Sequence, residues 1–102
     1  MRHVFHQEAS LEFEEAVRFY KSRGRELGVR LSSEVRATIR RILETPERWR
    51  FLEADVRRCL VRVFPYSVLY TVESEFILII AIMHHKREPG YWRHRLDSKP
   101  EV

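Results

Sequence analysis

A dense group of titratable and cationic side chains follows an apolar segment near the C-terminus. The residues His84-His85-Lys86-Arg87 come directly after the apolar run Phe76 to Met83, and Tyr91-Trp92-Arg93-His94-Arg95 follows shortly afterwards. Imidazole, guanidinium and phenol groups together can support metal-independent RNA cleavage. In that reaction a base activates the ribose 2′-hydroxyl, cations stabilise the pentacovalent phosphate, and an acid protonates the leaving oxygen. The same groups can instead bind phosphates or carboxylates without any reaction.

The spacing of the two histidines limits what this cluster can do. Neighbouring residues of an extended segment point to opposite faces, so at most one of His84 and His85 faces a given site. The alternative interpretation is that the segment is a solvated strand end, with Trp92 as an aromatic anchor on the edge of the core. Spacing alone leaves both interpretations open.

Further arginines lie in a segment of alternating character. Arg57, Arg58 and Arg62 are charges on a predicted strand and should face water or a partner, and one edge of the small sheet is expected to be open. An open basic edge accepts a partner strand or an acidic helix. Equally, these arginines could only guard the edge against aggregation. Three more arginines, Arg36, Arg40 and Arg41, are interpreted as a solvated helix face.

Several classes of function lack support in the sequence. It contains no glycine-rich phosphate loop, no Cys-x-x-Cys and no His-Glu-x-x-His, so no cofactor or metal is expected. Cys59 is the single cysteine and is interpreted as a packed thiol. With no disulfide and no apolar secretion signal at the N-terminus, a cytoplasmic location is expected. Phe76 to Met83 is far shorter than the roughly 20 residues of a membrane-spanning helix, so no membrane partner is expected.

The first half of the chain predicts a strand and two helices. Residues 2 to 6 carry β-branched and aromatic side chains typical of a short strand. Apolar residues recur at helical spacing from Ala9 to near Gly24, and again from Leu27 until Thr45-Pro46. The short link Gly24 to Gly28 predicts an antiparallel helical hairpin with one shared apolar face.

The second half changes to a period of two after a loop over residues 46–55. Segments 57–64, 67–73 and 76–84 predict an antiparallel meander, and residues 89–96 predict a short C-terminal helix. The order β-α-α-β-β-β defines an α+β fold, with the N-terminal helical hairpin packed on a small antiparallel sheet. A length of 102 residues with 44% hydrophobic residues fits one domain, expected over residues 1–96, with a tail over residues 97–102.

The strand motifs resemble a known superfamily. Arg57-Arg58-x-Leu60-x-Arg62-x-Phe64-Pro65-Tyr66 is followed by His84-x-x-Arg87-x-Pro89-x-Tyr91-Trp92, and Glu44-Thr45-Pro46-Glu47-Arg48-Trp49 precedes them. This combination resembles the RelE/ParE superfamily of toxins from bacterial type II toxin–antitoxin modules. The resemblance covers nearly the whole chain. It implies the same fold, a bacterial or plasmid origin with a role in plasmid stabilisation, and a cognate antitoxin that forms a hetero-oligomer with the toxin.

The RelE-like branch of this superfamily cleaves messenger RNA in the ribosomal A site. Its basic cluster includes an arginine just after the central tyrosine, where this chain has Ser67, and another past the last strand, which Arg87 matches. Tyr91 lies closer to Arg87 than the C-terminal tyrosine of those nucleases does. The loop Glu47 to Asp55 offers Arg48 and Arg50 but lacks their lysine pair. If the chain were such a nuclease, the resemblance would assign catalysis to His84, His85, Arg87 and Tyr91.

The ParE-like branch lacks this constellation and poisons DNA gyrase without being an enzyme, and the departure at Ser67 favours this branch. An antitoxin is then expected to lay an amphipathic helix, with an added strand, over the groove between the helical hairpin and the sheet. Its acidic residues would meet the arginines. A third hypothesis is a non-toxic antitoxin-binding or autoregulatory protein. The residues expected to bind the target or the antitoxin are Arg57, Arg58, Arg62, Tyr66, Arg87, Tyr91, Trp92, Arg93 and Arg95.

Overall fold

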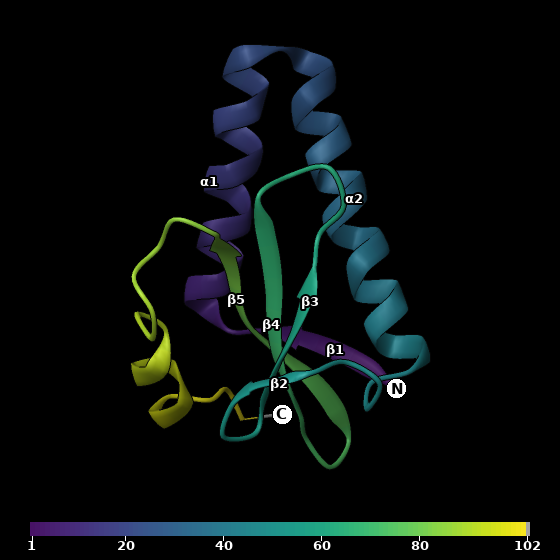
Figure 1. Ribbon diagram of the computed structural model, residues 1–102, viewed down its shortest axis with the longest axis vertical. Helices are drawn as coiled ribbons and strands as arrows, with labels where there is room; N and C mark the ends of the chain where they lie inside the picture. The colour runs from purple at the N-terminus through teal and green to yellow at the C-terminus, as the bar shows by residue number, and fades with distance from the viewer. Residues whose placement is uncertain (102) are drawn as a thin grey trace.

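A computed structural model describes residues 1–101 of the chain and shows two helices against one five-stranded sheet (Figure 1). Within these residues, no helix is long and apolar enough to cross a membrane. The sheet order is β1-β5-β4-β3-β2. The elements in chain order are β1 (Arg2–Phe5), α1 (Gln7–Arg23), α2 (Arg25–Glu44), β2 (Phe51–Glu53), β3 (Val56–Leu60), β4 (Tyr66–Val72), β5 (Phe76–His84) and the 3-10 helix η1 (Arg93–Asp97).

The α+β class and the predicted order of elements are confirmed, with two differences in the sheet. Strands β3, β4 and β5 form the antiparallel meander, but β1 pairs parallel with β5, with Arg2 opposite Phe76. The sheet is therefore mixed rather than wholly antiparallel. The second difference is β2, a short edge strand inside the predicted loop. Three residues are too few to show a periodicity, which is why the sequence did not reveal it.

The helical hairpin is tighter than expected. Gly24 alone separates α1 from α2, and Gly28 lies inside α2 rather than in the link. A Cβ atom on Gly28 would lie 2.9 Å from Cβ of Lys21, so the glycine permits close approach of the two helices. His6 caps α1, because its Nδ1 accepts a hydrogen bond from the backbone N–H of Glu8 at 3.1 Å.

The helices cover one face of the sheet and bury the main core. Residues from both helices and from alternate strand positions pack there, which is the pattern that amphipathic helices on a sheet require. The fully buried members include Leu31, Val35 and Ile42 of α2 and Val68, Tyr70, Ile77 and Ile79 of the sheet. The predicted stripe on the second helix is confirmed at these positions.

The segment after β5 covers the opposite face. Trp92 is 1% exposed and packs against Val56, Leu69 and Leu78. The short C-terminal helix begins only at Arg93, because Gly90 has a φ of 75° and interrupts the helix that was expected from Pro89.

The end of the chain is also attached to the domain. Asp97 still belongs to η1. Ser98 Oγ lies 3.0 Å from His6 Nε2, and Lys99 Nζ lies 3.1 Å from a carboxylate oxygen of Glu73. Residues 97–99 of the expected tail therefore contact the rest of the domain.

The first strand of the meander is shorter than the predicted segment 57–64, because the loop between β3 and β4 begins well before Pro65. Strand β3 stops at Leu60, and Val63 adopts a φ of 75°, which is incompatible with a strand. Tyr66 already belongs to β4. Arg62 and Val63 are consequently loop residues, and their side chains lie beyond the end of β3.

Candidate functional site: an arginine groove at the sheet edge

The basic C-terminal segment is largely neutralised within the domain. Four basic side chains after β5 each contact a carboxylate from another element, so much of the basic group expected to bind a partner is already engaged within the domain. The four pairs are Arg93 with Glu53 at 2.5 Å, His94 with Glu8 at 3.0 Å, Arg95 with Glu12 at 2.7 Å and Lys99 with Glu73 at 3.1 Å.

Glu12 organises the buried part of this segment. The Arg95 side chain is only 5% exposed where it meets Glu12, and Tyr91 donates its hydroxyl hydrogen to Glu12 at 2.5 Å. The guanidinium of Arg87 stacks 3.8 Å from the centre of the Tyr91 ring. Burial and the Glu12 carboxylate raise the pKa of Tyr91 far above its ordinary value, so Tyr91 is a poor general acid near neutral pH. These residues hold the C-terminal segment in place.

The two histidines lie on opposite faces of the sheet, as their spacing predicts. The His84 ring packs 5.0 Å from the ring of Tyr66 on the helix side. His85 Nε2 lies 2.9 Å from Ser67 Oγ on the other side. Burial lowers the pKa of His84. The four residues that a nuclease would need, His84, His85, Arg87 and Tyr91, are consequently not brought to one point.

Three of the residues expected to bind a partner are buried. Trp92 is 1% exposed within the core of the second sheet face, and Arg95 is 4% exposed under Glu12. Tyr66 is 8% exposed and packs against Tyr20 and His84. We therefore assign Trp92 and Arg95 to the support of the fold, since their side chains do not reach the surface.

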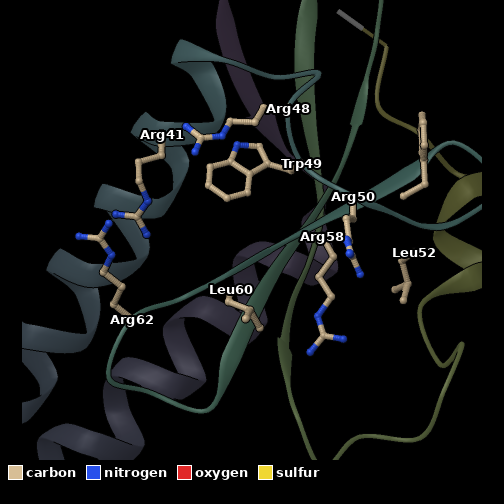
Figure 2. Close-up of a pocket in the computed structure, with 9 residues that line it drawn as sticks. Arg41, Arg48, Trp49, Arg50, Leu52, Arg58, Leu60 and Arg62 are labelled. Carbon is tan, nitrogen blue, oxygen red and sulfur yellow. The ribbon is translucent and has the colours of Figure 1, made fainter.

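The uncompensated arginines gather elsewhere, in an open groove of about 860 Å³ at the edge of β3 (Figure 2). Five arginines and four apolar residues line it, and no aspartate or glutamate does. The lining residues are Arg41, Arg48, Arg50, Arg58, Arg62, Trp49, Phe51, Leu52 and Leu60. No ion pair involves any of these arginines within residues 1–101. The groove therefore presents a concentrated positive charge to solvent.

The groove follows an unpaired stretch of strand edge. On the β2 side, the pairing of β3 ends where the backbone N–H of Arg58 donates to the Arg50 carbonyl at 2.9 Å. Leu60 lies beyond this point, paired only with Ser67 of β4. Leu60 and Phe51 are each 57% exposed. An open strand edge with exposed apolar side chains is what a partner strand would bind.

The arginines of the groove come from several elements around the open edge of β3. Arg41 of α2 and Arg62 of the β3–β4 loop point toward one another (Figure 2), and both lie near the buried thiol of Cys59. Burial raises the pKa of Cys59, consistent with a packed thiol. The Arg48 guanidinium lies 5.3 Å from the Trp49 ring, and Trp49 Nε1 is buried without a hydrogen-bond partner. Arg41 thus belongs to the groove as well as to the expected solvated face of its helix.

Arg57 shapes the groove from behind. Its Nη1 donates to the carbonyls of Glu47 and Trp49, both at 2.9 Å, and its guanidinium lies 3.8 Å from the Phe51 ring centre. Of the three arginines that the sequence placed on a strand, Arg58 and Arg62 line the groove. Arg57 does not line it but fixes the backbone of the loop before β2, which forms one side of the groove. The sequence analysis did not identify Trp49, Phe51 and Leu52 as part of a site. The feature that could have revealed them is three large apolar residues close together in the predicted loop 46–55.

The fold is a small α+β domain, and the groove gives it an open cationic surface at one edge of the sheet. The sequence matches the family of ParE toxins of the type II toxin–antitoxin system parDE over residues 4–89. The chain belongs to this family, and it is therefore a toxin component of a type II toxin–antitoxin module, as the resemblance implied.

A solved structure supports the fold independently. A chain of the chromosomal ParDE toxin–antitoxin system from P. aeruginosa superposes with a TM-score of 0.73 at 15% sequence identity. The similarity covers 82% of this chain and 95% of that chain. No curated protein matches the sequence significantly.

Proposed function

We propose that this protein acts by inhibiting DNA gyrase and is neutralised by a cognate antitoxin that binds the arginine groove. Family membership supports the first part, since the resemblance implies gyrase as the target of ParE-like toxins. The groove supports the proposed antitoxin binding, because it combines five arginines, no carboxylate and an open strand edge.

The arrangement of the nuclease candidates also favours gyrase over messenger RNA as the target. Ser67 is fully buried at the position where a nuclease would place an arginine. Tyr91 is bonded to Glu12, and the two histidines face opposite sides of the sheet. Removing one charge-stabilising donor typically reduces a rate by 10²- to 10³-fold, so a site missing several is a poor catalyst.

The groove fits an acidic amphipathic segment of an antitoxin. A strand added beside Leu60 would continue the sheet, and its backbone would pair with the free edge of β3. Acidic side chains on the same segment would meet Arg58 and Arg62, while apolar ones would cover Phe51 and Leu52. Complementary charges speed association and set the register, and the apolar contacts supply affinity.

A gyrase assay with the purified protein tests the first part. Relaxed plasmid is incubated with gyrase and ATP, and trapped cleavage complexes are released as linear DNA by detergent and protease. We expect linear DNA to accumulate with toxin concentration, while a parallel cell-free translation reaction continues. Arrest of translation, with cleavage of messenger RNA in primer extension and no effect on gyrase, would establish the nuclease alternative. Absence of toxicity on induction without antitoxin would instead leave the autoregulatory hypothesis.

Charge reversal tests the second part. The double variant R58E/R62E should weaken binding of the cognate antitoxin by about 30-fold or more, because truncating or reversing partners of buried charge pairs costs about 2 kcal/mol or more. The matched control is R30E/R40E, which places the same charge change at two exposed positions of α2 outside the groove. Equal binding by both variants would place the antitoxin on another surface.

A further inference from the structure

We propose that Arg58, Ser67 and His85 form a binding site for a phosphate group on the sheet face opposite the helices. The three side chains come from β3, from β4 and from the residue after β5. Arg58 Nε donates to Ser67 Oγ at 2.9 Å, and Ser67 Oγ lies 2.9 Å from His85 Nε2. This site shares Arg58 with the arginine groove, but it does not depend on the gyrase proposal.

The strand alternation explains why these residues meet. Cys59 and Val68 belong to the core under the helices, so their neighbours Arg58 and Ser67 point to the opposite face. Arg58 lies opposite Leu69 on β4, which makes it a diagonal neighbour of Ser67. His85 follows the end of β5, where its backbone N–H donates to the carbonyl of Pro65 at 2.9 Å.

Ser67 positions the other two groups and is too deeply buried to contact a ligand. A guanidinium only donates hydrogen bonds, so the Ser67 oxygen accepts from Arg58. Its own proton can then be donated to His85 Nε2, the other partner of Ser67 in residues 1–101. In the neutral tautomer of His85 that accepts this bond, the hydrogen lies on Nδ1, which leaves that N–H as a donor.

The remaining donors of Arg58 and His85 have no side-chain partner among the described residues. The two Nη groups of Arg58 make no hydrogen bond or ion pair with another side chain among the described residues, and His85 is exposed. Arg50, the residue before β2, accepts a hydrogen bond from the Arg58 backbone N–H through its carbonyl, and the two side chains extend in the same direction in Figure 2. The carboxylate of Glu53 is held by Arg93. This corner of the sheet face thus carries uncompensated donors and positive charge.

A phosphate group suits this arrangement better than a carboxylate. The two Nη groups of Arg58 can bind two oxygens of one anion, and the His85 donor can bind a third oxygen. A phosphate monoester offers three terminal oxygens and a charge of about −1.5 to −2, and a backbone phosphodiester offers two terminal and two bridging oxygens in a tetrahedron with a charge of −1, whereas a carboxylate offers two coplanar oxygens and −1. Leu60 and Met83 lie on either side of Ser67 and would contact apolar parts of a larger ligand.

Two sources can present such a group, a nucleic-acid backbone and a small phosphorylated molecule. The test uses inorganic phosphate and a fluorescent single-stranded DNA 12-mer as separate probes. Phosphate titration is followed by the Arg58 Nε–Hε and His85 ring resonances in NMR spectra. Oligonucleotide binding is followed by fluorescence anisotropy at several salt concentrations.

The expected result is saturable phosphate binding that weakens about tenfold or more in R58Q and in H85Q, since each removes one charge-assisted or polar contact. R40Q, at an exposed position of α2, is the matched control and should bind as the parent does. S67A keeps both ligand-contacting groups, and its weaker binding at an unchanged melting temperature would confirm the positioning role.

The two probes distinguish the sources. Binding of both, with a salt slope for the 12-mer that falls by about 0.7 in R58Q, identifies a nucleic-acid backbone. Binding of phosphate alone identifies a small phosphorylated ligand. No saturable change with either probe, or equal weakening in R40Q and R58Q, would overturn the proposal.

Discussion

Glu12 of α1 and Arg95 of η1 form a two-point ion pair that closes the exposed edge of β5. Arg95 Nη1 lies 2.7 Å from Glu12 Oε1, and Arg95 Nη2 lies 3.1 Å from Glu12 Oε2. Each partner also bonds to β5, because Glu12 accepts from the Ile82 N–H at 3.1 Å and Arg95 donates to the Ile80 carbonyl at 3.0 Å. The two side chains thus satisfy backbone groups that β1 is too short to reach.

Replacing Glu12 by glutamine should therefore destabilise the domain substantially. The substitution leaves the buried guanidinium of Arg95 without its main counter-charge, a change that typically costs 3–5 kcal/mol. We expect about 3 kcal/mol, because Glu8 Oε1 lies 3.6 Å from Arg95 Nε and still offers a carboxylate. Urea unfolding measures this loss. E14Q is the control, since Glu14 is exposed on the same helix, and an equal loss in both variants would contradict this role of Glu12.

Acid should loosen the C-terminal segment before it unfolds the rest. The hydrogen bond from His94 lowers the pKa of Glu8, and the bond from Arg93 lowers the pKa of Glu53. A pKa that is lower in the folded state means that the unfolded chain binds more protons, so the stabilisation is complete above the unfolded pKa of about 4.5. This stabilisation is lost as the pH falls through the lower pKa values that Glu8 and Glu53 have in the folded protein.

The measurement is the free energy of unfolding between pH 7 and pH 3, together with amide exchange over residues 85–97. We expect a decline that starts near pH 4.5 and early loss of protection in this segment. The variant E8Q/E53Q should show a smaller decline than the parent. A decline of the same size in the parent and the variant would mean that other carboxyl groups control acid stability.

Sequence patterns predicted the elements more accurately than the contacts of charged residues. The stripe from Leu31 to Ile42 and the run Phe76 to Met83 fixed the helical hairpin and the central strand, because burial imposes a period on many residues at once. The pairing of Arg95 with Glu12 joins residues 83 positions apart and leaves no local pattern. For that reason the basic segment after β5 looked like a binding surface, although its charges are mostly satisfied internally.

Arg57 should affect antitoxin binding indirectly, by fixing the loop beside the groove, rather than by contacting the antitoxin. Its guanidinium holds the carbonyls of Glu47 and Trp49, and glutamine cannot span both. We expect R57Q to lower the free energy of unfolding by about 1.5–3 kcal/mol, the range for hydrogen bonds that involve a charged group. Amide exchange over residues 46–51 should rise at the same time. Weaker antitoxin binding with unchanged exchange in this loop would show instead that Arg57 contacts the partner.

Val63 stores backbone strain at the tip of the β3–β4 loop, and relieving it should stabilise the protein. Its φ of 75° is unfavourable for a β-branched residue and costs about 1–3 kcal/mol, whereas glycine adopts it freely. Its side chain is 68% exposed, so little apolar burial is lost on removal. Glycine also gains chain entropy on unfolding, which offsets about 0.5–1 kcal/mol of the gain.

We therefore expect V63G to raise the free energy of unfolding by about 1 kcal/mol in urea titrations. V63A is the matched control, because alanine loses the same side chain but keeps the penalty for a positive φ. The difference between the two variants isolates the backbone term from side-chain burial. A glycine variant that is less stable than the alanine variant would show that the loop carries no strain at this position.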